Sequence, residues 1–134
     1  MFATKSASRA VSWNRVWFFT GVAVVSNLVI FAIGSIAGAD WLAQGQTLQA
    51  IGWYFVVGAS VVPLLLAAVV TGLLARVWRG APLVLAWVGL AFGVLTAPAG
   101  LFAAPQLGTG LALASMHIVA GIAWFFAIRP RAVA

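Results

Sequence analysis

The sequence has very few charged residues and no cysteine. Of its 134 residues only 6% are charged, and Asp40 is the single acidic one. The absence of cysteine excludes a disulfide framework, a thiol nucleophile and a thiolate metal site. Because a water-soluble domain devotes about a quarter of its residues to charge, so few charges cannot cover a soluble fold of this length. The bilayer must therefore be the solvent for most of the surface.

Long apolar runs fill most of the chain, which is 65% hydrophobic with a mean hydropathy of +1.16. A hydrocarbon core about 30 Å thick requires about 20 helical residues, and the runs that meet this length are 16–37, 50–75, 83–103 and 108–128. They are continuous rather than alternating in polarity, which indicates helices and not barrel strands. The prediction is an all-α, integral membrane four-helix bundle, with residues 1–134 forming a single transmembrane domain.

The cations indicate how the bundle is oriented. They occur before the first run, between the second and third, and after the fourth, as Lys5, Arg9, Arg15, Arg76, Arg79, Arg129 and Arg131. Four crossings place all of them on one side, so the positive-inside rule predicts cytoplasmic termini in a bacterial inner membrane. Such scattered cations do not form the basic stripe of a nucleic-acid-binding protein. The residues expected to contact anionic lipid headgroups are Arg15, Arg76, Arg79 and Arg129.

Small residues suggest which helix faces touch protein, because inside lipid they allow backbones to approach each other. The third run carries Gly89, Gly93, Thr96 and Gly100 at helical spacing, and the fourth repeats that spacing around His117. The predicted helix-packing residues are Gly34, Gly38, Gly89, Gly93, Gly100 and Gly121. Of these, Gly34 with Gly38, or the third-run stripe, are candidate surfaces for self-association.

A polar layer is expected near the membrane midplane. Asn27 and His117 each lie about 15–17 Å from the cytoplasmic end of their runs, and both share the small-residue stripes. We therefore expect both side chains to face protein, together with Thr96 or Ser60. An unpaired amide or imidazole in hydrocarbon costs several kcal/mol, so each should find a hydrogen-bond partner.

The layer admits a structural and a functional interpretation. As glue between helices, a neutral His117 fixes their register; as a functional group, it carries a proton or contacts a ligand. One imidazole without a nearby carboxylate or thiol is a poor metal site, so neither a metal nor a cofactor is expected. Asp40, the only acidic side chain, is predicted at the external boundary, far from His117. No enzyme is therefore predicted.

The pattern resembles small four-span actinobacterial membrane proteins that are grouped as a family of unknown function. The resemblance depends on Asn27, on the basic loop "RVWRG" at 76–80 and on "MHIVAG" at 116–121, and it covers nearly the full length. It implies a fold but no activity. Small multidrug transporters have four spans of similar length, but they depend on an acidic residue in the first span, where this chain has Asn27.

Three functions remain open at this point. The leading prediction is a non-enzymatic, self-associating scaffold or accessory membrane component, either as a homo-oligomer or with other membrane subunits. The alternative is a homo-oligomeric channel or transporter for a small solute or ion, which uses the layer around Asn27 and His117. A third is a lipid or quinone site between helices.

Overall fold

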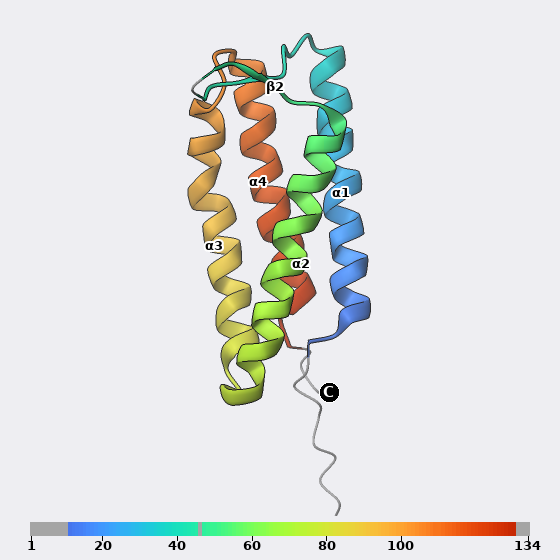
Figure 1. Ribbon diagram of the computed structural model, residues 1–134, viewed down its shortest axis with the longest axis vertical. Coiled ribbons are helices and arrows are strands. Elements are labelled where there is room, and N and C mark those ends of the chain that lie inside the picture. The colour runs from blue at the N-terminus through green and yellow to red at the C-terminus, as the bar shows by residue number, and fades with distance from the viewer. Residues whose placement is uncertain (1–10, 46, 131–134) are drawn as a thin grey trace, which may run out of the picture.

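The structure, a computed structural model, describes residues 11–45 and 47–130. Its four helices are α1 (Trp13–Ile36), α2 (Trp53–Val77), α3 (Ala81–Phe102) and α4 (Leu107–Ile128), packed together as a bundle (Figure 1). They contain 24, 25, 22 and 22 residues and are apolar enough to cross a membrane. At 1.5 Å per residue, the shortest is about 33 Å long and spans the hydrocarbon core. The prediction of an all-α membrane bundle is confirmed.

The helices form without side-chain capping. No N-cap side chain of the four helices donates or accepts a capping hydrogen bond. In hydrocarbon, a helix is stabilised because it satisfies its backbone groups internally, where no water replaces those bonds. This solvent effect also explains why α2 and α3 continue through Pro63 and Pro98, two residues that would break most helices in water.

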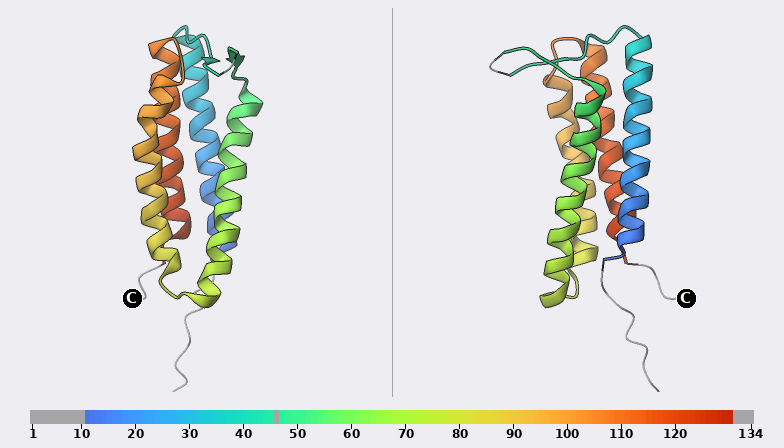
Figure 2. Two further views of the ribbon diagram at one scale, coloured as in Figure 1. Left: turned by 60° about the vertical axis from the view of Figure 1, so that its left-hand side comes forward. Right: turned by 45° about the vertical axis from the view of Figure 1, so that its right-hand side comes forward.

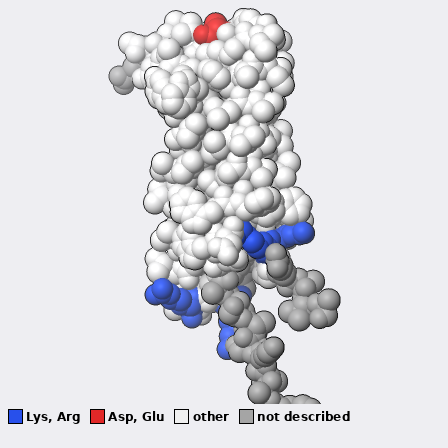
Figure 3. Space-filling model, turned by 90° about the vertical axis from the view of Figure 1, so that its right-hand side faces the viewer, with Lys and Arg blue, Asp and Glu red and all other residues white. Residues whose placement is uncertain are grey.

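Charge is segregated between the two ends of the bundle. The start of α1 and the end of α4 lie at the same end, as expected for an even number of crossings (Figure 1). Arginine side chains gather at that end and Asp40 lies at the opposite one (Figure 3). Lys5, Arg9 and Arg131 lie outside the described residues.

The packing is uneven around the bundle. α4 packs closely against α3 and against α1, and α1 packs against α2, whereas α2 contacts α3 and α4 at only a few positions. Figure 2 shows α3 beside α4, with α2 standing apart from α3 except near the loop that joins them. The order is therefore α3, α4, α1, α2, and the bundle is open along one side, between α2 and α3.

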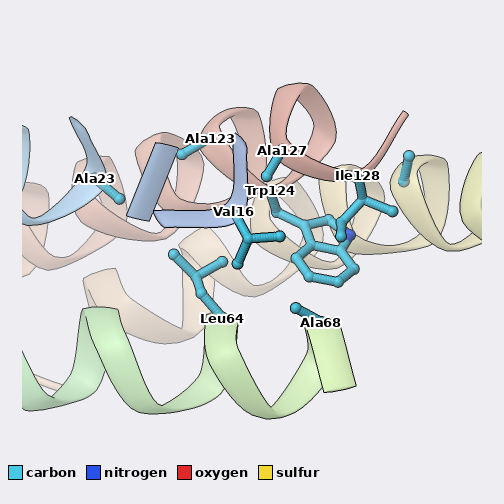
Figure 4. Close-up of a cluster of buried hydrophobic side chains, with 9 residues drawn as sticks. Val16, Ala23, Leu64, Ala68, Ala123, Trp124, Ala127 and Ile128 are labelled. Atoms are coloured by element: carbon cyan, nitrogen blue, oxygen red, sulfur yellow. The ribbon is translucent and has the colours of Figure 1, made fainter. Parts of the chain in front are cut away.

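Two apolar clusters fill the interior. The first lies toward the arginine end and is built around Val16, Leu64 and Trp124 (Figure 4). The second lies toward the Asp40 end and includes Val56 and Met116. α1, α2 and α4 or their flanking residues contribute to both clusters, and Ala86 of α3 joins the first.

The segment between α1 and α2 departs from the all-α pattern. It forms a small antiparallel ribbon of β1 (Leu42–Ala43) and β2 (Gln49–Ala50) at the Asp40 end. The Gln44 amide donates to the Ala103 carbonyl over 2.6 Å, which ties the ribbon to the end of α3. The ribbon therefore joins the helix pair α1–α2 to the pair α3–α4 at this end.

Candidate functional site at mid-depth

A buried hydrogen bond joins α1 to α2 between the two apolar clusters. Asn27 Nδ2 donates to Ser60 Oγ over 2.9 Å, and each residue is only 3% exposed. Ser60 Oγ in turn donates to the Val56 carbonyl over 2.8 Å, as serine commonly does one turn back in a helix. Of the predicted polar layer, the structure brings Asn27 and Ser60 together.

The Asn27 amide is only half satisfied. Its Oδ1 is the one buried side-chain polar atom, within the part of the chain that the structure describes, that has no hydrogen-bond partner. A buried acceptor that makes no hydrogen bond costs about 1–3 kcal/mol. A group kept at such a cost is a candidate for contact with something outside the chain.

His117 lies on the surface of the single chain, so its imidazole does not face another part of this chain. Contact of this side chain with a neighbouring copy stays a prediction. Nδ1 of His117 lies 2.8 Å from the Leu113 carbonyl. That oxygen can only accept, so Nδ1 carries the hydrogen, and in the tautomer that this contact requires Nε2 is an acceptor.

Asn27, Ser60 and His117 line one pocket of about 150 Å³. The other lining residues are apolar, namely Ile51, Phe55, Val56, Ala59, Leu113, Met116 and Ala120. Phe55, Ala59 and His117 are exposed whereas Asn27 and Ser60 are buried, so the pocket leads from the surface to the Asn27–Ser60 pair. It lies where α2 contacts α4 only sparsely.

Thr96 does not join this group. Its hydroxyl donates to the Phe92 carbonyl over 2.6 Å, within its own helix, and it does not line the pocket. The expected layer is thus divided into an interhelical pair, an imidazole at the pocket edge and a hydroxyl on α3.

The glycines of α3 and α4 lie against each other. A Cβ added at Gly93 would lie 2.6 Å from the His117 carbonyl oxygen and 2.8 Å from Gly121 Cα, and one at Gly100 would lie 3.0 Å from the Ala114 amide nitrogen. At Gly89 the added atom would meet the Trp124 ring, whose Nε1 donates to the Leu85 carbonyl over 2.7 Å. The third-run stripe is therefore occupied within the chain.

The two glycines at the end of α1 differ from expectation. Gly34 packs against the Trp41 ring and not against another long helix. Gly38 lies beyond the helix, has a φ of 84°, and its added Cβ would meet nothing within 4 Å. Its role in helix packing is a wrong prediction, since the left-handed turn after α1 is what requires glycine here.

The arginines gather around the ends of the helices. Arg15 donates to the carbonyls of Phe126 and Arg129 (2.8 Å for the latter) at the end of α4, where a helix favours positive charge. The Arg129 guanidinium lies 4.6 Å from the centre of the Phe126 ring. Arg76 and Arg79 are exposed. Contact of these four residues with lipid headgroups stays a prediction.

Sequence reasoning missed a polar cluster at the opposite end. The hydroxyl of Thr109 donates to Asp40 Oδ1 over 2.7 Å and accepts from the Trp41 amide over 3.1 Å. Gln106 accepts from the Asp40 amide over 2.8 Å and donates to the Gly38 carbonyl over 3.0 Å. The signal in the sequence was a loop acid together with Gln106 and Thr109 at the start of the fourth run. Among residues 11–45 and 47–130, no three His, Asp or Glu residues group as a metal site.

These features define the class of the molecule: a multi-pass membrane protein of four helices with a small pocket at mid-depth. Residues 7–134 match the model of a family of unknown function, DUF6069, and the chain belongs to that family. No curated protein and no solved structure matches the chain.

Proposed function

We propose that this protein is a non-enzymatic membrane protein that binds an apolar molecule from the bilayer in the pocket between α1, α2 and α4. The observation that carries the proposal is Asn27 Oδ1, which is buried without a partner beside a pocket with apolar walls. Ligand pockets typically combine such walls with a few convergent polar groups.

The depth of the pocket supports entry from the bilayer. Asn27 lies nine residues before the end of α1 at Ile36, which is about 14 Å below the end of the helix. The exposed lining residues Phe55 and Ala59 are on α2, whose side toward α3 is open. A molecule dissolved in the acyl chains reaches this opening sideways, without crossing the polar cluster around Asp40.

Most of the glycines predicted to mediate self-association contact other parts of the same chain. Gly89, Gly93 and Gly100 contact α4, and Gly34 contacts Trp41. Self-association stays a prediction. Gly38, one of its named residues, is exposed and has nothing within 4 Å of an added Cβ, and the same holds for Gly21 on α1.

The channel alternative has less support than the pocket. Thr71, Thr96 and Ser115 bond carbonyls of their own helices. They offer little to replace the hydration of a solute, which a permeation path has to do.

The absence of a catalytic pairing supports a non-enzymatic role. Asp40 accepts from Thr109, which lies eight residues, or about 12 Å, along α4 from His117. The only acidic side chain is thus held away from the only imidazole. The charge segregation seen in Figure 3 supports a bacterial inner-membrane location with the arginine end in the cytoplasm.

Photolabelling tests the proposal. The purified protein in lipid nanodiscs is irradiated with alkyl probes that carry a diazirine, and the labelled peptides are mapped by mass spectrometry. We expect labelling at Phe55, Ala59 and Met116 that saturates and is displaced by excess unlabelled 1-dodecanol. Val70 and Val77 are exposed on α2 outside the pocket and serve as internal controls, with labelling that does not saturate. Uniform, non-saturating labelling of all these positions would overturn the proposal.

A further inference from the structure

We infer that the ligand is a neutral molecule with a hydroxyl group, and that it donates its one hydrogen to Asn27 Oδ1. The inference rests on the proposed function, and it names the chemical class that the pocket selects. It follows from the direction of each hydrogen bond around the pocket.

The direction of the Asn27–Ser60 bond is fixed by the number of available hydrogens. A serine hydroxyl has one hydrogen, and Ser60 donates it to the Val56 carbonyl. Ser60 Oγ can therefore only accept from Asn27, so Nδ2 points to Ser60 and Oδ1 is the end left unsatisfied. What Asn27 lacks is a donor.

His117 also has an acceptor that lacks a hydrogen-bond donor. With the Nδ1 hydrogen directed at the Leu113 carbonyl, the neutral ring keeps a lone pair on Nε2. Nε2 has no partner among residues 11–45 and 47–130. Two acceptors on different helices, α1 and α4, therefore line the same pocket.

Pro63 removes the usual amide donor for one carbonyl of α2. Proline has no amide hydrogen for the carbonyl four residues earlier, and that carbonyl belongs to Ala59, a pocket residue. The remaining lining side chains are hydrocarbon, thioether or aromatic hydrocarbon groups. Besides the second hydrogen of Asn27 Nδ2, the side chains of the pocket therefore offer a ligand the acceptors Asn27 Oδ1 and His117 Nε2.

An acceptor-lined pocket in hydrocarbon selects a neutral donor. An ammonium group would need a compensating carboxylate at this depth, and Asp40 is held at the end of the bundle. A ketone, ester or ether has no hydrogen to donate. An alcohol supplies the hydrogen without a charge.

The size of the pocket fits the end of a longer molecule. A volume of about 150 Å³ corresponds to roughly five water molecules in the liquid, at about 30 Å³ each. This is enough for a hydroxyl and the first few carbons. The rest of a chain would lie along α2 over Val62 and Leu66, which are exposed on the face of Ala59. Because α2 is held loosely by α3 and α4, a small outward shift of α2 opens the way to Oδ1.

Matched probes test the inference. We use a dodecyl alcohol with a diazirine in its chain, its methyl ether, and the corresponding methyl ketone, each in competition with its own unlabelled form. In the wild-type protein, we expect the alcohol to saturate Ala59 and Met116 at a concentration about tenfold lower than the ether or the ketone, as one buried hydrogen bond predicts.

Two variants make the test specific. Asn27→Leu removes the acceptor at similar volume and should bring the alcohol to the level of the ether, while Thr96→Val, outside the pocket, should leave the tenfold preference intact. If the ether saturates the pocket at the same concentration as the alcohol, or if the ketone saturates it at the lowest concentration, the inference is overturned. The proposed function still stands in both cases. Failure of every probe to saturate the pocket overturns the proposed function itself.

Discussion

The seam between α3 and α4 and the seam between α2 and α3 are made of equally apolar helices, yet one is closed and the other is open. At the closed seam Gly93 and Gly121 lie backbone to backbone. At the open seam, α2 and α3 contact each other at only a few positions, and α2 has exposed Val62, Leu66 and Val69. Hydrophobicity cannot explain the difference, because lipid tails are as apolar as these side chains.

The difference between the two seams is explained by how closely the helix backbones approach each other. Where glycines meet, the helices gain dispersion contacts that lipid cannot supply as well. Where large side chains keep two helices apart, as between α2 and α3, lipid tails contact these side chains as well as another helix would. No packing energy then draws the helices together. The pocket beside Asn27 exists because α2 is held by α1 and by the loops at its two ends, and only weakly by the closed pair.

The closed seam can be broken at its narrowest point. Gly93→Ala puts a methyl group 2.6 Å from the His117 carbonyl oxygen, and relief requires movement of a backbone. We expect the free energy of unfolding to fall by about 2–3 kcal/mol, measured by titration with SDS in mixed micelles.

Gly58→Ala is the matched control on the open side. Nothing lies within 4 Å of a Cβ added there, so stability should stay the same or rise slightly with the better helix former. Equal losses for the two variants would mean that the two seams do not differ in packing.

A smaller effect is expected from Trp124→Phe. The indole is 6% exposed, covers Gly89 and donates to the Leu85 carbonyl. Losing this bond and part of the ring should lower the free energy of unfolding by about 1–2 kcal/mol.

Trp17→Phe, at a residue 58% exposed, should change stability by less than about 0.5 kcal/mol. Both variants are followed by thermal unfolding in the same detergent. If the exposed indole mattered as much as the buried one, membrane anchoring and not the closed seam would dominate the stability.

The spans could be predicted closely from the sequence. The length of an apolar run is set by bilayer thickness, and the observed helices begin and end within three residues of the predicted runs. The separation of Asp40 from the arginines followed from the same count of crossings. Which end faces the cytoplasm stays a prediction of the positive-inside rule.

The contacts between helices could be predicted only in part. Inside lipid, every face of a helix is apolar, so only small and polar residues carry information about neighbours. That information placed Asn27 and Ser60 in one layer, but it also grouped Thr96, which bonds its own helix. It could not show that Gly38 lies in a turn, nor that His117 is exposed on the single chain. The cluster of Asp40 with Thr109 depends on how the ribbon folds back over α4, which no local pattern encodes.

The last effect is expected where α1 meets α2, because the polar pair there opposes stability and does not support it. Asn27→Leu removes an amide whose Oδ1 has no partner and forfeits one bond to Ser60, whose hydroxyl still reaches the Val56 carbonyl. Interhelical bonds in membranes contribute about 0.6 kcal/mol, less than the roughly 1–3 kcal/mol cost of a buried unsatisfied acceptor. We therefore expect the free energy of unfolding to stay level or to rise by about 1 kcal/mol in the SDS titration. A clear loss would show that Asn27 serves as glue between α1 and α2, whereas unchanged stability together with lost preference for the alcohol would show that the amide is kept for its ligand.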